Sequence, residues 1–277
     1  MFGKEVTPIT SGSEWFIDKP LLEKSVLDQN VLFTILSVLA IATVVYAVRM
    51  CRREATAIPL YILGGAALAC FYEPLGDLLA HVTYAELNQV NYIESFGFLV
   101  PLWVLPAYIL FFGLPTLYFL DKVRRGMSLS WWMSLFVLSV VGSWLFEIPL
   151  IMLEFQSYYG DNAPFKLLGY PVWMGFVNAA TMSIVATCVV FLRNSWLGRE
   201  YPSAYVILFP LLVSGANTGS GLPLSYAINS SDDVTIVNLM ACVAIILSTA
   251  YAWICGNLLR VHGPLPVHYD TGGVDPK

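Results

Sequence analysis

Apolar residues recur along the chain in seven long runs that are separated by short polar segments. The runs lie near residues 29–50, 57–80, 96–120, 129–153, 167–192, 203–227 and 234–259. Each run is long enough to cross about 30 Å of hydrocarbon as a helix that rises about 1.5 Å per residue. The pattern therefore predicts an all-α, polytopic integral membrane protein with seven transmembrane helices.

Basic residues are distributed unevenly between the two ends of these runs. Ten of the fourteen follow the first, third, fifth or seventh run: Arg49, Arg52, Arg53, Lys122, Arg124, Arg125, Arg193, Arg199, Arg260 and Lys277. The other four are Lys4, Lys19, Lys24 and Lys166. Because Lys and Arg accumulate on the cytoplasmic side of membrane proteins, we expect the N-terminus outside and the C-terminus in the cytoplasm.

This orientation divides the chain into three parts. Residues 1–28 form an extracytoplasmic segment, residues 29–260 the transmembrane domain, and residues 261–277 a Pro/Gly-rich cytoplasmic tail that we expect to be disordered. The composition agrees, since 57% of the residues are hydrophobic and only 12% are charged. We expect the lipid bilayer as the main partner and no nucleic acid. The membrane would be the plasma membrane in a bacterium and the endoplasmic reticulum in a eukaryote.

The second and third runs resemble the fourth and fifth. Phe-Tyr-Glu-Pro at 71–74 corresponds to Leu-Phe-Glu-Ile-Pro at 145–149. Each pair of runs then has a loop, a glycine and a Pro-x-Trp motif, at Gly97 and 101–103 in one and at Gly169 and 171–173 in the other. Parallel repeats of this kind often place a site at their shared interface. The alternative is a chance similarity between Pro- and Trp-rich helices.

Two glutamates lie deep within the predicted spans. Inserting an ionisable side chain costs roughly 2.5–3.5 kcal/mol, so such residues are functional candidates. Counted from the cytoplasmic ends, Glu73 lies ~24 Å and Glu147 ~27 Å along their helices. Asn178 and Asn217 lie at ~21 Å and Trp103 at ~26 Å. Five helices therefore offer polar or amphipathic groups at one level, although each asparagine alone is also typical of a hydrogen bond between helices.

A second group of ionisable residues lies nearer the outer surface. Glu73, Asp77 and His81 stand at i, i+4 and i+8, which predicts one shared helix face. Glu154 stands seven residues after the deep glutamate of the fourth run, on the same predicted face, and Glu94 lies at the outer mouth. Position at the membrane–water interface, where charge costs little, is the alternative explanation for these shallower residues.

The deep carboxylates have no obvious salt-bridge partner, because no Lys or Arg lies within these spans. We therefore expect at least one to be protonated near neutral pH and to be suited to general acid catalysis. The candidate catalytic residues are Glu73, Glu147 and Asp77. The candidate substrate-binding residues are Glu94, Glu154, His81, Trp103, Trp144, Trp173, Asn178, Asn217 and Tyr72. Aromatic rings among them would stabilise a carbocation.

These features resemble the small seven-helix membrane-integral terpene cyclases of meroterpenoid pathways. The resemblance covers the size, the helix number and intramembrane acids such as Glu73 and Glu147. It implies an enzyme of the cyclase or isomerase type, without a cofactor, that acts on a lipophilic small molecule such as a terpenoid. A carboxylic acid would protonate an alkene or epoxide, and a second carboxylate would remove a proton.

Two other classes of function fit part of the pattern. Intramembrane acids and interrupted helices also suit a proton- or cation-coupled transporter or channel, but the cytoplasmic halves of the helices are almost purely apolar. A membrane hydrolase or oxidoreductase would use Glu73, Asp77, His81 and Glu147 as ligands, which favour Mg or iron. A retinal protein is disfavoured, because the seventh run contains no lysine for a Schiff base. The oligomeric state is not predicted.

Overall fold

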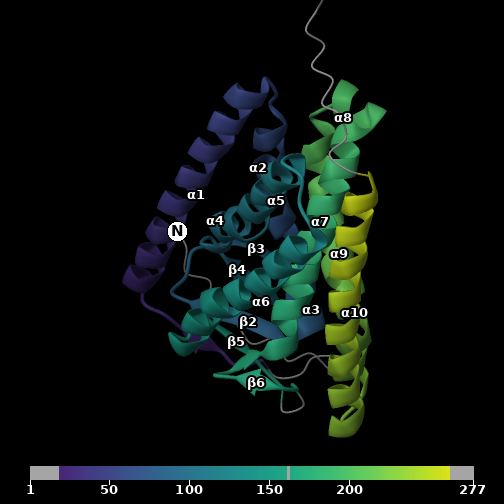
Figure 1. Cartoon of the computed structure of the whole chain (residues 1–277). Coiled ribbons are helices and arrows are strands. Elements are labelled where there is room, and N and C mark those ends of the chain that lie inside the picture. The colour runs from purple at the N-terminus through teal and green to yellow at the C-terminus, as the bar shows by residue number, and fades with distance from the viewer. Residues whose placement is uncertain (1–18, 161–162, 263–277) are drawn as a thin grey trace, which may run out of the picture.

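The computed structural model of the chain describes residues 19–160 and 163–262, and helices dominate it (Figure 1). Seven of these helices are long and apolar enough to cross a membrane, which confirms the predicted helical bundle. The orientation in the membrane stays a prediction. Most of the predicted N-terminal segment and nearly all of the predicted disordered tail lie outside the described residues.

The seven spans are built from eleven helical segments. The first span is α1 (Val26–Glu54), and the second consists of α2 (Ile58–Ala69), the 3₁₀ turn η1 (Cys70–Tyr72) and α3 (Glu73–Ala80). The third consists of α4 (Val104–Tyr108), the π-helical turn η2 (Ile109–Gly113) and α5 (Leu114–Arg124). The others are α6 (Leu129–Met152), α7 (Val172–Asn194), α9 (Ala204–Ser230) and α10 (Val234–His262). The short helix α8 (Trp196–Glu200) connects α7 to α9.

The breaks within the second and third spans have causes in the sequence. Pro74 has no N–H group to donate to the carbonyl of Cys70 four residues earlier, and the hydroxyl of Tyr92 donates to that carbonyl at 3.1 Å. Pro115 likewise offers no N–H group to the carbonyl of Phe111, which lies in η2. A single π-helical turn within an α-helix is frequently found at a functional site.

Short strands cover the end of the bundle that we predict to face outward. β2 (Val82–Leu87) pairs in parallel with β1 (Leu22–Glu23) and antiparallel with β5 (Gln156–Tyr158). Two hairpins lie beside this sheet, namely β3 (Asn91–Ser95) with β4 (Phe98–Pro101), and β6 (Lys166–Leu167) with β7 (Tyr170–Pro171).

These strands correct two predicted boundaries. The third and fifth runs were expected to be helical from residues 96 and 167, but their helices begin at Val104 and Val172. Most of the apolar residues between lie in strands and their turns, and a short apolar run does not distinguish a buried strand from a helix. Residues 83–92, which connect the second run to the third, are likewise mostly strand.

The two hairpins turn in the same way. β3 and β4 are joined by Phe96 and Gly97 with φ of 51° and 76°, and β6 and β7 by Leu168 and Gly169 with φ of 51° and 84°. Two-residue hairpin turns with positive φ at both positions strongly favour glycine. Both copies of the sequence repeat therefore share a local structure that the glycine makes possible.

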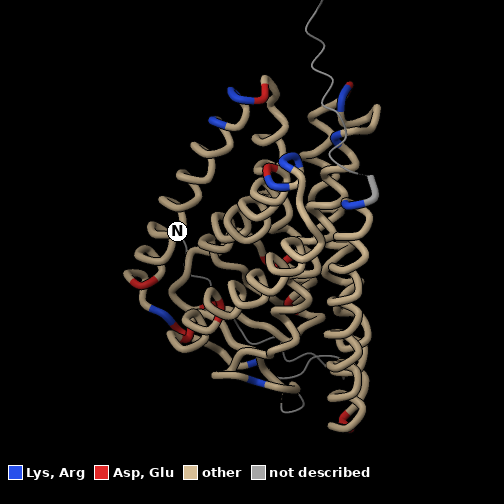
Figure 2. The backbone as a smooth tube through the Cα atoms, in the orientation of Figure 1, with Lys and Arg blue, Asp and Glu red and all other residues tan. Residues whose placement is uncertain are grey.

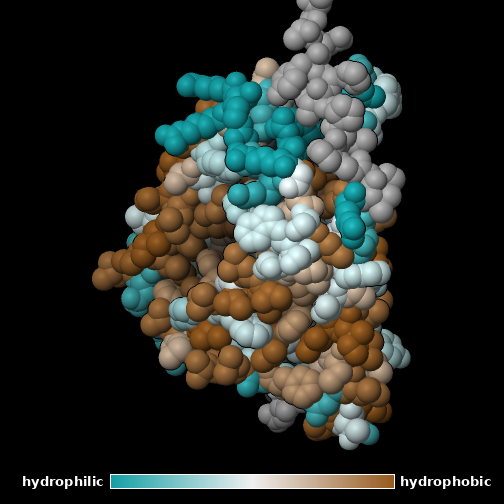
Figure 3. All heavy atoms as spheres, in the orientation of Figure 1, coloured by the Kyte–Doolittle hydropathy of each residue, from teal (hydrophilic) through white to brown (hydrophobic). Residues whose placement is uncertain are grey.

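The centre of the bundle is α7, which packs against α5, α6, α9 and α10, whereas α1 lies at the periphery against α2 and α4. Basic residues gather at one end of the bundle (Figure 2) and apolar side chains cover much of the surface between the ends (Figure 3). At the basic end the buried Glu54 forms ion pairs with Arg53, Arg124 and Arg193. These pairs connect α1 to α5 and α7.

Candidate functional site

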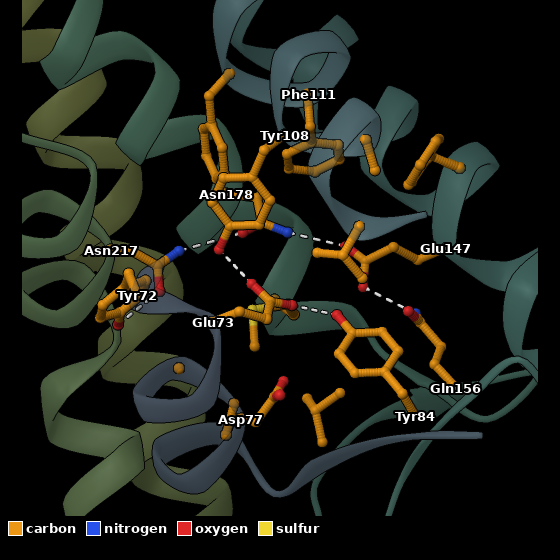
Figure 4. A pocket seen from close by; sticks show the side chains of 18 of the residues that line it. Tyr72, Glu73, Asp77, Tyr84, Tyr108, Phe111, Glu147, Gln156, Asn178 and Asn217 are labelled. Atoms are coloured by element: carbon orange, nitrogen blue, oxygen red, sulfur yellow. Dashed lines mark hydrogen bonds between the residues drawn. The ribbon is translucent and has the colours of Figure 1, made fainter. Parts of the chain in front are cut away.

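A cavity of about 100 Å³ lies inside the bundle, beneath the strands. Its walls come from the second, third, fourth, fifth and sixth spans and from β2 and β5. Ten of the lining side chains are labelled in Figure 4: Tyr72, Glu73, Asp77, Tyr84, Tyr108, Phe111, Glu147, Gln156, Asn178 and Asn217. The predicted deep level of polar groups is therefore the wall of one cavity.

Glu73, the first residue of α3, is held by two tyrosines. The hydroxyl of Tyr84 donates to its Oε1 and the hydroxyl of Tyr108 donates to its Oε2 (Figure 4). Among the described residues, no Lys or Arg forms an ion pair with this carboxylate. The phenol groups therefore take the place that a cation occupies in a salt bridge.

Glu147 on α6 accepts four hydrogen bonds. Tyr158 and Gln156 donate to its Oε2 at 2.7 and 3.2 Å. Asn178 and Tyr170 donate to its Oε1 at 3.0 and 3.2 Å. Four is about the number of hydrogen bonds that a carboxylate can accept, so this side chain is fixed in position and its acceptor sites are filled.

Three of these tyrosines come from the strands rather than from the spans. Burial and the neighbouring carboxylate of Glu73 raise the pKa of Tyr84 well above its ordinary value. Burial and the carboxylate of Glu147 do the same to the pKa of Tyr158 and of Tyr170. All three phenols therefore keep their protons and act as donors near neutral pH.

Asp77 differs from both glutamates. It is 2% exposed and lies one helical turn after Glu73, and its side chain points into the space beside Glu73 and Tyr84 (Figure 4). Its Oδ2 has no hydrogen-bond partner within the described part of the chain. A buried polar atom without a partner is rare and requires an explanation.

A row of hydrogen-bonded side chains leads from Tyr72, the residue before Glu73, to Glu147. Asn217 donates to Asn178 at 3.3 Å, and Tyr72 contacts both Asn217 at 3.3 Å and Thr218 at 2.8 Å. Asn178 in turn donates to Glu147. The prediction that Asn178 and Asn217 lie at the depth of the deep acids is confirmed by these bonds.

The two halves of the site correspond to the two copies of the sequence repeat. Tyr84 follows Glu73 by eleven residues, and Tyr158 follows Glu147 by eleven residues. The second donors also correspond, because Tyr108 and Asn178 each stand five residues after the tryptophan of a Pro-x-Trp motif.

The strands of the two halves pair around a local twofold axis. Val82 lies opposite Tyr158, and Tyr84 lies opposite Gln156, so each tyrosine faces the residue two positions before its counterpart. The next hydrogen bonds outward match as well, at 2.9 Å from Tyr159 N to the His81 carbonyl and at 2.9 Å from Ala85 N to the Phe155 carbonyl. Any antiparallel pair has such symmetry, so the equal spacings from each glutamate to its tyrosine and from each Pro-x-Trp motif to its second donor are what support a parallel repeat over chance similarity.

Three of the shallower predicted residues do not reach the cavity. Glu94 on β3 and Glu154 are exposed. Glu154 does not share a helix face with Glu147, because α6 ends at Met152 and Glu154 has a left-handed φ of 57°. His81 also has a left-handed φ, of 53°, and this turn ends α3 and takes the side chain off the face of Asp77.

The buried His81 has its own partners outside the cavity. Its Nε2 lies 3.1 Å from Asn229 Oδ1, and its ring stacks on Tyr159 with centroids 5.2 Å apart. Burial lowers the pKa of His81. The four side chains named for a metal site therefore do not converge. Among the described residues, no group of three or more His, Cys, Asp or Glu side chains is arranged to hold a metal ion.

Of the three tryptophans predicted to bind substrate, one lines the cavity and two do not. Trp103 lines the cavity and meets Tyr84 edge-on, with ring centroids 5.3 Å apart. Trp173 is buried and Trp144 packs against Phe176, and neither lines the cavity.

Sequence reasoning did not identify Gln156 or the tyrosines as donors to the two glutamates; these tyrosines are Tyr84, Tyr108, Tyr158 and Tyr170. The spacing of eleven residues from each glutamate to a tyrosine is the signal that would have identified the first donors. Comparisons with protein-family models, with curated proteins and with solved structures gave no match for this chain.

Proposed function

We propose that the protein is a membrane-embedded enzyme that protonates an alkene of a lipophilic substrate and then removes a proton, giving a cyclised or isomerised product. The observation that supports this most is Asp77, whose Oδ2 is buried without a partner in a cavity that also holds two other carboxylates. Burying an unpaired charge costs far more than burying the neutral acid. Asp77 is therefore the group that carries a transferable proton.

The proposed step balances without a further reactant. Asp77 gives its proton to one alkene carbon, the π electron pair forms the new C–H bond, and the other carbon becomes a carbocation. Glu73, one turn earlier on the same face of the helix, takes a proton from a neighbouring carbon, and the electrons of that C–H bond form a new double bond. Between turnovers Glu73 releases this proton to the solvent and Asp77 takes up another from the solvent.

The rest of the cavity suits a carbocation. The rings of Trp103, Tyr84 and Phe112 line it, and the negative faces of aromatic rings attract a cation. Glu147 is oriented by four donors, so its carboxylate needs no rearrangement as positive charge develops.

Deuterium incorporation tests this proposal directly. The full chain would be expressed in a host rich in isoprenoid lipids, and its membranes incubated with those lipids in D₂O. We expect a product with the elemental composition of its precursor that gains one deuterium per turnover. Asp77→Asn and Glu73→Gln should lower its formation by about 10²- to 10⁴-fold, the usual contribution of general acid–base catalysis.

The exposed carboxylates supply matched controls. Glu94→Gln and Glu154→Gln remove the same functional group outside the cavity, and both variants should keep full activity. Full activity in the well-expressed Asp77→Asn and Glu73→Gln variants would refute the mechanism.

A transporter is the alternative that the same preparation can test. Along α7 towards the basic end, the hydroxyls of Thr181, Ser183 and Thr187 donate to carbonyls of their own helix at 2.8–2.9 Å, so these groups are already satisfied. This arrangement does not favour a polar pathway there. Proton flux into proteoliposomes that requires Glu73, without any lipid product, would overturn the enzyme proposal.

A further inference from the structure

A second hollow lies beside the acidic cavity, between η2 and α5 on one side and α6 on the other. Its volume is about 420 Å³, and its lining is apolar, including Leu110, Leu114, Leu138 and Gly142. Leu138 is 64% exposed and Leu114 is 37% exposed, so the hollow opens on the apolar surface of the bundle. We call this hollow the α5–α6 groove.

Two phenylalanines separate the groove from the cavity. Phe111 and Phe146 line both spaces, and their ring centroids lie 5.6 Å apart at an interplanar angle of 51°. Phe146 immediately precedes Glu147, and Phe111 lies on the π-helical turn η2 and faces the cavity near Tyr108 (Figure 4). The side chains that line both spaces are therefore two aromatic rings, one of them adjacent in the sequence to Glu147.

The size of the cavity requires a second space. Binding sites for drug-sized molecules are usually about 300–1,000 Å³, whereas the cavity at the carboxylates is about 100 Å³. The cavity has room for only the reacting end of a lipophilic molecule. The groove, at about 420 Å³, is large enough for the remainder, and it shares Phe111 and Phe146 with the cavity.

We propose that the α5–α6 groove binds the isoprenoid tail of the substrate, which enters from the bilayer and passes an alkene between Phe111 and Phe146 to the carboxylates. This inference rests on the proposed function, because protonation by Asp77 requires an alkene at the leading end. An isoprenoid chain supplies alkenes along its length and matches the apolar lining. The substrate class is thus an isoprenoid amphiphile rather than a saturated lipid.

Filling the groove tests the proposal. A Cβ at Gly142 would meet no atom within 4 Å, so Gly142→Leu should fold and occupy the groove. Gly215→Leu is the matched control, because Gly215 on α9 also has open space and lines a different hollow. The probe is a diazirine-bearing analogue of geranylgeraniol, crosslinked to the purified full chain in detergent. We expect labelling of groove residues that falls at least tenfold in Gly142→Leu and is unchanged in Gly215→Leu.

A second probe tests whether the groove prefers an isoprenoid chain to the saturated acyl chain of a phospholipid. A diazirine-bearing saturated phosphatidylcholine should label the groove weakly. Equal labelling by both probes would show an annular lipid only and would overturn the proposal, as would undiminished labelling in Gly142→Leu.

The labelling result is independent of catalysis. Asp77→Asn should keep the geranylgeraniol labelling while it loses product. If the groove is labelled but Asp77→Asn keeps full activity, the proposed function fails and the tail site stands. If Asp77→Asn loses product but the groove is not labelled, only the tail site fails.

Discussion

Glu73 and Glu147 occupy corresponding positions in the two halves of the bundle, but their surroundings differ. Glu147 accepts four hydrogen bonds, whereas Glu73 accepts two. The residue four positions later is Asp77 in one half and the apolar Ile151 in the other. One half therefore fixes its carboxylate fully, and the other adds a second carboxyl with an unpartnered oxygen.

The additional donors to Glu147 arise at positions where the other half is apolar. Gln156 stands nine residues after Glu147, and Val82 stands nine residues after Glu73. Tyr170 directly follows the turn glycine of its hairpin, and Phe98 directly follows the turn glycine of the other. A shared backbone thus carries two different hydrogen-bonding environments, which suits a fixed negative charge in one half and proton transfer in the other.

Removing each glutamate should expose this difference most strongly. Glu147→Leu leaves four buried donors without an acceptor and Glu73→Leu leaves two, and each orphaned group costs about 1–3 kcal/mol. We expect Glu147→Leu to lower the free energy of unfolding by roughly 4 kcal/mol or more, about twice the loss for Glu73→Leu. Reversible unfolding in mixed micelles measures both.

The exposed Glu94→Leu is the control for this pair and should be close to neutral. Equal losses in Glu147→Leu and Glu73→Leu would show that the number of donors does not decide the stability of the two halves. The difference in hydrogen bonding between the two glutamates would then have no measurable effect on the free energy of unfolding.

The corresponding tyrosines give a finer test. Tyr84→Phe leaves Glu73 with one donor, and Tyr158→Phe leaves Glu147 with three. A hydrogen bond to a charged group contributes about 1.5–3 kcal/mol, so we expect Tyr84→Phe to lie at the upper end of this range and Tyr158→Phe at the lower end. Tyr84→Phe should also reduce product formation more.

The same unfolding and product assays check this prediction, with Tyr226→Phe as the control because Tyr226 is 73% exposed. A larger effect of Tyr158→Phe on both stability and product formation would reverse the roles assigned to the two halves.

The sequence was sufficient to predict the spans and the depth of the site. The apolar length of a span determines its helix, and residues such as Asn178 and Glu147 fall at one level because every helix rises by the same amount per residue. The boundary at Val104 could not be found in this way, since the strand before it is apolar too.

The donors from the strands could not be found by counting depth. Tyr84 and Tyr158 lie beyond the ends of the spans, and only strand pairing brings them back against the carboxylates. The exposure of Glu154 was also unpredictable from its spacing, because the spacing assumes a helix that has in fact ended at Met152. Periodicity predicts faces only within an element.

The row of side chains between the halves should contribute less than either carboxylate environment. Asn217→Ala removes the bonds to Asn178 and Tyr72, and hydrogen bonds between helices in membranes average about 0.6 kcal/mol. We expect a stability loss of about 1 kcal/mol for the two bonds, measured by unfolding in mixed micelles. Asn257→Ala, whose side chain bonds only within its own helix, is the control. A loss above about 3 kcal/mol would show instead that the row determines the stability of the whole site.

The smallest difference between the halves lies at His81, whose counterpart is the non-titrating Phe155. Burial lowers the pKa of His81 below the 6.5 of an unperturbed histidine, so below about that pH the unfolded chain binds more protons than the folded chain. Folding stability should therefore fall as the pH drops through and below 6.5, and be unaffected by this group above it. His81→Gln keeps a partner for Asn229 but cannot titrate, so it should flatten the acid side of the stability curve measured between pH 5 and 8. An unchanged acid slope in this variant would mean that His81 is not the group whose protonation opposes folding, and that the two halves do not differ in their response to pH at this position.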